Sequence, residues 1–202
     1  MVGVAWVFEV PRLASDVNTA LKDMGTELKG HYTVDCTIYN PSEKVKADEE
    51  LRKEIQDCYL LHHSHYPESS FIQRGAINRR TAAIVDRGLD LLLTKVSSPV
   101  LVPDTAGKFE VTGNEYQLVD FYIRVGAALM NSNTKGVIVE IEYAPSALPS
   151  QCGGLLEEAV GQLFPELKLA TPKFFLSHEE YIMADTVEQY LKVFQEMRQK
   201  AT

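Results

Sequence analysis

The sequence has few cysteines and no long apolar run, and both absences narrow the possibilities. Its 202 residues include three cysteines, Cys36, Cys58 and Cys152, with neither a CxxC pair nor the Cys/His spacing of a zinc site. Such scattered thiols are typical of a reduced cytosolic or nuclear protein. No apolar run approaches the roughly 20 residues of a membrane-spanning helix, and the start, MVGVAWVFEVPRL, lacks the pattern of a signal peptide. We therefore expect a soluble intracellular protein without a membrane partner.

Positive charge is also scarce. The chain has 20 Lys and Arg against 28 Asp and Glu, a formal net charge of −8. A protein that binds nucleic-acid phosphates needs clustered basic residues, and Arg74, Arg79 and Arg80 are the only candidates. We therefore expect no direct contact with nucleic acid. Hydrophobic residues make up 45% of the chain, which suits a single domain over 1–202 that needs neither a disulfide nor a metal to fold.

The most regular pattern is a pair of β-strands between Tyr116 and Tyr143. Apolar and polar residues alternate over 116–125 and again over 137–143, so each strand has one face for a core. The polar connection 130–136 ends in Gly136 and predicts a hairpin, because parallel strands would need a longer crossover. On the core face we expect four buried side chains, Phe121, Ile123, Val139 and Ile141.

The same periodicities predict the other elements. Strands are expected over 2–10, 31–39, 57–65, 69–74, 81–86 and, weakly, 109–112. Helices are expected over 13–24, 89–96, 155–163 and 186–199, the last with Asp185 and Glu188 in an N-terminal capping arrangement. The charged segment 44–54 is either an exposed helix or a mobile surface insertion. About eight strands with few helices between them predict an α+β fold, mainly an antiparallel β-barrel with flanking helices, including a C-terminal helix.

Glu140 and Glu142 form an E-x-E pair on one face of the second hairpin strand. Carboxylates on the inner wall of a β-barrel can hold a divalent metal over a triphosphate, as in tunnel-type triphosphatases. No second E-x-E pair is present, and the opposite face of the strand suits the core better. We therefore expect both glutamates to point outward into solvent and to be non-catalytic. A metal-dependent tunnel-type triphosphatase that uses Glu140 and Glu142 remains the alternative.

Three other motifs yield no chemistry. His62, His63 and His65 could begin a zinc or copper site, but no Cys or His elsewhere is positioned to complete it. We expect these histidines to be solvent-facing or hydrogen-bonded at a strand end. Gly153-Gly154 lacks the Lys-Ser or Lys-Thr of a phosphate loop, and no G-x-S-x-G elbow is present. The residues alone therefore predict no catalytic residue, no cofactor and no metal.

The hairpin also carries a resemblance to a known family. Its sequence, YQLVDFYIRVGAALMNSNTKGVIVEIEYAPS, resembles the hallmark segment of the Mediator complex subunit 20 family: a Y-Q-x-x-D-F strand that ends in K/R-V-G, then a G-hydrophobic-x-V-E-hydrophobic-E-Y-x-P strand. The initial MVGVAWVFEVP, the histidine region 63–71 and the D-T-x-x-Q-Y-x-x-x-F pattern of 185–194 resemble the family in the same order. The segments 44–54 and 167–181 show no such match.

The resemblance implies a function that the residues alone do not. It implies a non-enzymatic subunit of the head module of Mediator, the nuclear coactivator that links activators to RNA polymerase II. It also implies a β-barrel with flanking helices, a heterodimer with the related Mediator subunit 18 and docking of a C-terminal helix of Mediator subunit 8. Contact with RNA polymerase II would be indirect.

Overall fold

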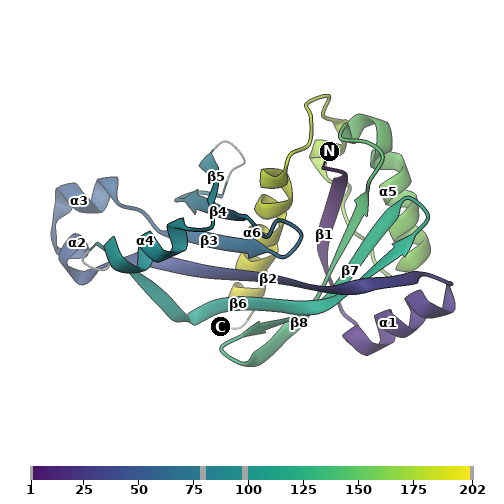
Figure 1. The fold of residues 1–202 in the computed structure, drawn as a ribbon, viewed down its shortest axis with the longest axis horizontal. Helices are drawn as coiled ribbons and strands as arrows, with labels where there is room; N and C mark the ends of the chain where they lie inside the picture. The colour runs from purple at the N-terminus through teal and green to yellow at the C-terminus, as the bar shows by residue number, and fades with distance from the viewer. Residues whose placement is uncertain (1, 78–80, 97–99, 201–202) are drawn as a thin grey trace. The chain divides into compact units, whose positions relative to one another are not determined.

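The computed structural model describes residues 2–77, 81–96 and 100–200 (Figure 1). The strands are β1 (Val4–Val10), β2 (Glu27–Pro41), β3 (Cys58–His63), β4 (Ser69–Arg74), β5 (Ala82–Asp86), β6 (Leu101–Leu118), β7 (Phe121–Met130) and β8 (Asn133–Tyr143). The helices are α1 (Ala14–Asp23), α2 (Glu43–Ala47), α3 (Glu49–Glu54), α4 (Leu89–Val96), α5 (Pro149–Leu163), the 3₁₀ helix η2 (Lys173–Leu176) and α6 (Met183–Gln199). Among the described residues, no helix has the length and apolar character needed to cross a membrane.

The eight strands are hydrogen-bonded in the order β1-β8-β7-β6-β2-β3-β4-β5. Pairing is antiparallel between β1 and β8, β2 and β3, β3 and β4, and β4 and β5. The helices include α6 near the C-terminus. The predicted α+β fold, mainly antiparallel with about eight strands and flanking helices, is confirmed.

The chain divides into two compact units. Unit 1 comprises Met1–Tyr32, Thr112–Ala127 and Gly136–Thr202, and unit 2 comprises Thr33–Val111 and Ala128–Lys135. The division passes through β2, β6, β7 and β8, so these four strands contribute residues to both units. A single domain over 1–202 stays a prediction.

The turns of the central hairpins differ from the prediction. The sequence alternation predicts one strand over 116–125, but β6 ends at Leu118 and β7 begins at Phe121. Val119 lies in the turn between them, with φ at 53° and 79% of its surface exposed. This left-handed conformation is unfavourable for a β-branched residue. An apolar turn residue therefore preserved the alternation and hid the turn from the sequence pattern.

The second hairpin turn is at Asn131-Ser132, whose φ angles are 48° and 63°. Two consecutive positive φ angles are what a type I′ hairpin turn requires. Gly136 was expected to close this loop, but it lies within β8. A Cβ there would come within 3.0 Å of Met197 Cε, so the glycine allows α6 to pack closely on β8.

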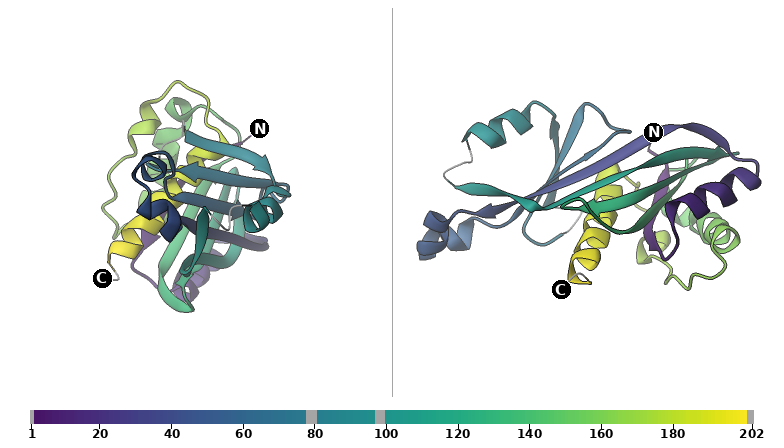
Figure 2. Two further views of the ribbon diagram at one scale, coloured as in Figure 1. Left: turned by 90° about the vertical axis from the view of Figure 1, so that its left-hand side faces the viewer. Right: turned by 90° about the horizontal axis from the view of Figure 1, so that it is seen from below.

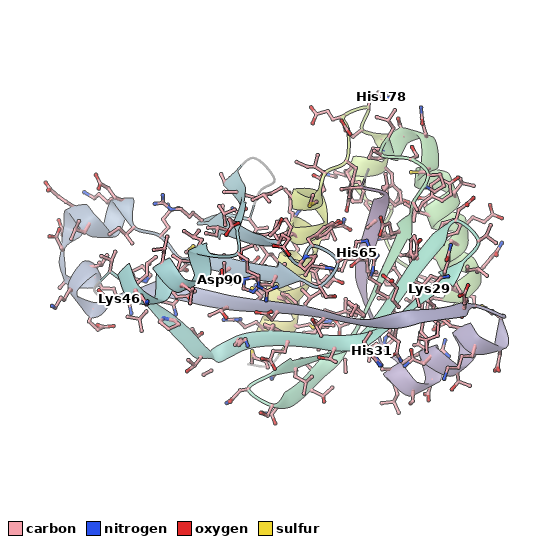
Figure 3. All side chains as sticks on the ribbon, viewed as in Figure 1. Lys29, His31, Lys46, His65, Asp90 and His178 are labelled. Carbon is pink, nitrogen blue, oxygen red and sulfur yellow. The ribbon has the colours of Figure 1, made fainter. Side chains whose placement is uncertain are left out.

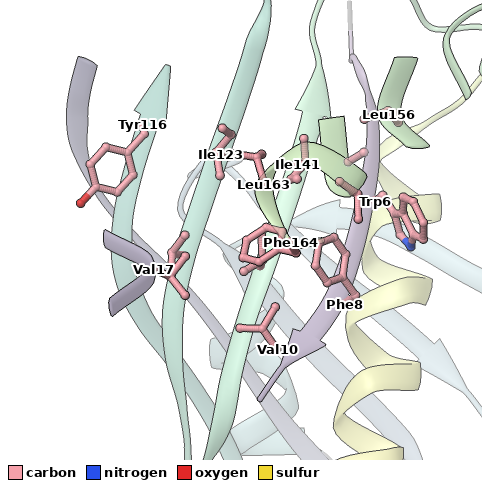
Figure 4. Packing of buried hydrophobic residues seen from close by; sticks show 14 of the residues in the cluster. Trp6, Phe8, Val10, Val17, Tyr116, Ile123, Ile141, Leu156, Leu163 and Phe164 are labelled. Carbon is pink, nitrogen blue, oxygen red and sulfur yellow. The ribbon is translucent and has the colours of Figure 1, made fainter. Parts of the chain in front are cut away.

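The main core of unit 1 lies where β1, β6, β7 and β8 face α1, α5 and η2 (Figures 2 and 4). Trp6 and Phe8 of β1 make edge-to-face contacts with Phe175 and Phe164, with ring centroids 5.3 and 5.7 Å apart. The first five residues of β1 are buried on both faces of the strand, which agrees with the apolar residues at both alternating sets of positions. Of the four expected core residues, Ile123, Val139 and Ile141 are fully buried, whereas Phe121 is only partly buried.

Helix α6 begins at Met183, three residues before the predicted start. Asp185 does cap it, but as the third helical residue: its carboxylate reaches back and accepts the Ile182 N–H at 2.7 Å. Glu188 has no part in this cap and instead pairs with Lys192 at 2.6 Å, one turn further on. The helix is therefore three residues longer at its N-terminus than the sequence pattern indicated.

Unit 2 contains a smaller apolar cluster, in which Tyr39, Cys58 and Leu60 pack with Leu93 of α4. The charged segment 44–54 forms α2 and α3, with Asp48 capping α3 through the Glu50 and Leu51 N–H groups. Of the two alternatives for this segment, the exposed helix is the one observed. All three cysteines are buried, and none of them forms a disulfide.

Candidate functional site

Glu140 and Glu142 are buried, which corrects the expectation that they face solvent. Their residues are 2% and 7% exposed, and β8 is buried on both faces from Val137 to Glu142. One face carries Val139 and Ile141 into the apolar core. The other, which carries the two glutamates, is also enclosed because α6 lies close to β8 on the side of Tyr190. The sequence showed the alternation but not this second cover.

Arg124 of β7 holds the two glutamates from the neighbouring strand. Its Nη1 donates to Glu140 Oε1 and to Glu142 Oε2, the latter at 2.8 Å. Its Nε donates to Glu115 Oε2 of β6 at 2.5 Å. Arg124 is 1% exposed and is among the largest fully buried side chains. One guanidinium therefore joins three adjacent strands through three carboxylates.

Further donors engage the remaining carboxylate oxygens. Tyr190 of α6 donates its hydroxyl to Glu140 Oε2 at 2.6 Å. The Gly3 N–H donates to Glu142 Oε1 at 3.1 Å. Both glutamates therefore accept hydrogen bonds at each of their two oxygens, as buried carboxylates require. We call Arg124, Glu115, Glu140, Glu142 and Tyr190 the arginine cluster.

Burial and charge act in opposite directions on these groups. Burial alone would lower the pKa of Arg124, but Glu140, Glu142 and Glu115 outweigh it and hold that pKa well above the ordinary value. Burial raises the pKa of the Tyr190 hydroxyl, and the negative charge of Glu140 raises it further. Arg124 is therefore a permanent cation and Tyr190 a permanent hydrogen-bond donor at physiological pH.

The arginine cluster differs from a triphosphate site in how its charged groups are exposed. A triphosphate site in a barrel needs carboxylates open to a metal and basic groups open to phosphate. Here the acidic and basic groups satisfy one another in an enclosed interior. Among the described residues, no group of three or more His, Cys, Asp and Glu side chains has the geometry to hold a metal ion.

The histidines of β3 lie in unit 2 and serve other roles. His62 is held between two carboxylates: its Nδ1 lies 3.1 Å from Asp35 Oδ1 of β2, and its Nε2 lies 2.8 Å from Asp90 Oδ2 of α4. Asp90 is labelled in Figure 3 and also accepts a hydrogen bond from Ser70 Oγ at 2.9 Å. We call these four residues the histidine cluster. His63 is buried, and its Nδ1 accepts the His65 N–H at 3.1 Å.

The pKa of His62 is raised above the ordinary value. The hydrogen bond to Asp35 is the main cause, and the negative charges of Asp35 and Asp90 add to it, while partial burial acts against it. The Nε2–Asp90 contact is an ion pair without the alignment of a good hydrogen bond. When His62 is protonated, its contacts with Asp35 of β2 and Asp90 of α4 are ion pairs that attach α4 to the sheet of unit 2.

Gly153 and Gly154 lie inside α5, whose helix starts at Pro149 and not at 155. A Cβ on Gly153 would come within 2.8 Å of Phe175 Cβ. Gly153 is therefore required for the packing of η2 on α5.

An apolar groove in unit 1 was not expected from the sequence. Its volume is about 240 Å³, and it is lined by Met24, Leu118, Phe121, Ile123, Leu155, Glu158, Ala159, Gln162 and Leu163. Met24 and Leu155 are 48% and 44% exposed. One feature of the sequence does indicate the groove: Leu155 and Ala159 make the apolar stripe of α5 wider than the part that faces the core. We call this surface the α5 groove.

Comparison with known proteins identifies the family. A family model described as the TATA-binding related factor (TRF) of subunit 20 of the Mediator complex matches residues 2–195. Mediator of RNA polymerase II transcription subunit 20 from Caenorhabditis briggsae is 35% identical, and the alignment covers 98% of this chain and 99% of the relative. The Homo sapiens protein of the same name is 29% identical, with 89% and 83% covered.

Comparison with solved structures gives weaker similarities. A chain of the Schizosaccharomyces pombe Mediator head module has a TM-score of 0.45 at 12% identity, covering 83% of this chain and 97% of that chain. A putative adenylyl cyclase from Hippeastrum with a dominant triphosphatase activity has a TM-score of 0.44 at 11% identity, covering 79% and 86%.

The sequence matches place this chain among the subunits of the Mediator of RNA polymerase II transcription. Within that class, the chain belongs to the Mediator subunit 20 family. The resemblance found in the hairpin, in the histidine region and in the terminal helix is therefore confirmed over nearly the whole chain.

Proposed function

We propose that this protein is a non-catalytic subunit of the Mediator head module, which works by stable assembly with the related β-barrel subunit 18 and with a C-terminal helix of subunit 8. The observation that carries the proposal is the family match over residues 2–195. The protein then acts in the nucleus and contacts RNA polymerase II only indirectly. With a net charge of −8, it reaches promoters through protein contacts and not through DNA.

The α5 groove supports a role in assembly. Its volume of about 240 Å³ is below the roughly 300–1,000 Å³ of pockets that bind small molecules. It suits one or two apolar side chains of a protein partner, which is how interface anchors are usually received. Glu158 is the charged residue at the groove, and α5 contains no Lys or Arg. A partner helix with apolar anchors and a flanking basic residue fits this surface.

The arginine cluster supports the absence of catalysis. A triphosphatase that used Glu140 and Glu142 would have to free both carboxylates from Arg124, which is 1% exposed. Breaking a buried pair in this way costs about 3–5 kcal/mol. We therefore expect no metal-dependent release of phosphate from nucleoside triphosphates, with Mg²⁺ or Mn²⁺. Turnover that disappears in a folded Glu140→Gln, Glu142→Gln double variant but persists in Glu157→Gln would establish the alternative enzyme.

Co-expression with subunit 18 tests the assembly. We expect one gel-filtration peak that survives moderate salt, because a stable interface buries above ~1,200 Å² around apolar anchors and depends little on ionic strength. Separate elution at micromolar concentration, or a shift of DNA by this chain alone, would contradict the proposal.

The subunit 8 helix provides a second arm of the same test. Leu155→Glu places a charge in the α5 groove and should weaken helix binding by at least about tenfold. The matched control is Leu176→Glu, which makes the same change at a leucine of η2 that is 81% exposed and outside the groove. Equal affinities of the two variants would remove the α5 groove from the proposal.

A further inference from the structure

The two strands at the ends of the sheet order, β1 and β5, differ in whether the outer backbone groups of the strand are hydrogen-bonded. Along β1, the side chain of Gln189 occupies the place of a neighbouring strand: its Oε1 accepts the Val7 N–H at 3.0 Å, and its Nε2 donates to the Ala5 carbonyl at 3.0 Å. Tyr181 Oη donates to the same carbonyl at 3.2 Å. Helix α6 thus closes the β1 edge against further pairing.

The β5 edge has no such closure. Within the described ranges, β4 is the sole strand neighbour of β5, and no side chain there bonds to the backbone of Ala82–Val85 as Gln189 does to β1. The five β4–β5 pairs run from Gln73–Ala82 to Ser69–Asp86 without a bulge. Alternate backbone N–H and C=O groups of β5 therefore point away from β4 and are available to another strand.

The sequence of β5 also lacks the usual protection of an edge. Natural proteins guard exposed edge strands with lysine, proline, bulges or covering elements. β5 reads AAIVD, with neither lysine nor proline; its one charged side chain, Asp86, lies at the end of the strand and accepts the Gly88 N–H. Ile84 is 46% exposed. The small side chains of Ala82 and Ala83 permit a close backbone approach, while Ile84 and Val85 favour β-branched neighbours. An edge of this kind is suited to strand addition.

We propose that β5 is the surface on which the partner β-barrel subunit adds an extended strand, so that the sheet of unit 2 continues into the partner. This inference rests on the proposed function and names the edge that assembly uses. The added strand would span about five residues, or ~17 Å, with apolar residues beside Ile84 and Val85. A second copy of this chain is the less favourable occupant, because two chains of net charge −8 repel one another.

Hydrogen exchange measured on the full chain, free and in complex with the partner subunit, tests the proposal. We expect the outward amides of Ala82–Asp86 to exchange at least about tenfold more slowly in the complex, because strand addition converts solvent-exposed N–H groups into hydrogen-bonded ones. Slowed exchange elsewhere with an unchanged β5 would overturn the inference and leave the proposed assembly intact. Absence of any complex would overturn the proposed function and the inference with it.

A lysine at the edge gives an independent measurement. Ile84→Lys should weaken the complex by about tenfold or more, while Leu51→Lys, at a leucine of α3 that is 40% exposed, should stay within about twofold. Thermal melts of both free variants check that the fold is retained. Equal affinities, or a free chain that sedimentation shows to be a dimer lost in Ile84→Lys, would overturn the choice of partner strand.

Discussion

Each unit contains a basic side chain that is held between carboxylates, but the basic residue is arginine in unit 1 and histidine in unit 2. In unit 1, Arg124 is surrounded by Glu115, Glu140 and Glu142 and is 1% exposed. In unit 2, His62 lies between Asp35 and Asp90, with 12% of its side chain exposed. Arg124 and His62 each join neighbouring strands and attach a helix, α6 through Tyr190 in one case and α4 through Asp90 in the other.

The difference lies in what each cation can do. A guanidinium remains charged at every physiological pH and offers several donors in a fixed plane, so it suits an enclosed site with many acceptors. An imidazole gains or loses its charge near neutrality, so its ion pairs weaken as pH rises. We infer that the arginine cluster gives unit 1 a stability that does not vary with physiological pH, whereas the histidine cluster makes the attachment of α4 adjustable.

Replacing Arg124 with methionine should have the largest effect. The variant leaves three carboxylates without their cation in an enclosed site, and breaking such a buried pair costs about 3–5 kcal/mol of unfolding free energy. Urea denaturation followed by circular dichroism measures the loss. The control is Lys192→Met, which removes the surface pair with Glu188 and should cost less than about 1 kcal/mol. A loss below about 1 kcal/mol for Arg124→Met would mean that the cluster does not support the fold.

Replacing Tyr190 with phenylalanine should have an intermediate effect. The change keeps the aromatic ring but removes the hydroxyl that donates to Glu140 Oε2, and an unsatisfied buried acceptor costs about 1–3 kcal/mol. The matched control is Tyr122→Phe, at a partly buried tyrosine of β7 beside Arg124. Equal unfolding free energies for the two variants would show that Tyr190 contributes packing alone.

The sequence pattern predicts most of the strands and helices, but not which polar faces are buried. Period-2 alternation located most of the strands, and β4 and α4 have the predicted bounds. Alternation marks which residues share a face, but it does not say whether a second layer covers the polar face. The alternation alone therefore predicts that Glu140 faces solvent. In the structure the Tyr190 hydroxyl covers it from a helix 50 residues further along the chain, and the pattern around Glu140 gives no sign of that distant contact. The partnership of Arg124 with both glutamates depends on strand register, which the sequence does not display.

The α5 groove and the β5 edge were missed for a related reason. Both surfaces exist because no neighbouring element covers them, whereas a sequence pattern shows only which residues are apolar. Leu155 and Ile84 looked like ordinary members of an apolar stripe and of a strand. Their exposure of 44% and 46% becomes visible only once the neighbouring elements are in place.

The pH dependence of the histidine cluster should be the smallest effect. The pKa of His62 is raised in the folded state, mainly by the hydrogen bond to Asp35 and further by Asp90, with Arg87 acting against it. A raised folded pKa means that the stabilisation is fully present below the unfolded value of about 6.5 and is lost as pH rises through the folded value. Between pH 6 and pH 9, the wild type should therefore lose more unfolding free energy than His62→Gln. His178→Gln, at an exposed histidine of unit 1, should follow the wild type. If the wild type and His62→Gln lost the same unfolding free energy over this range, the ion pairs of His62 would not contribute to folding, and the contrast between the two clusters would reduce to one of burial.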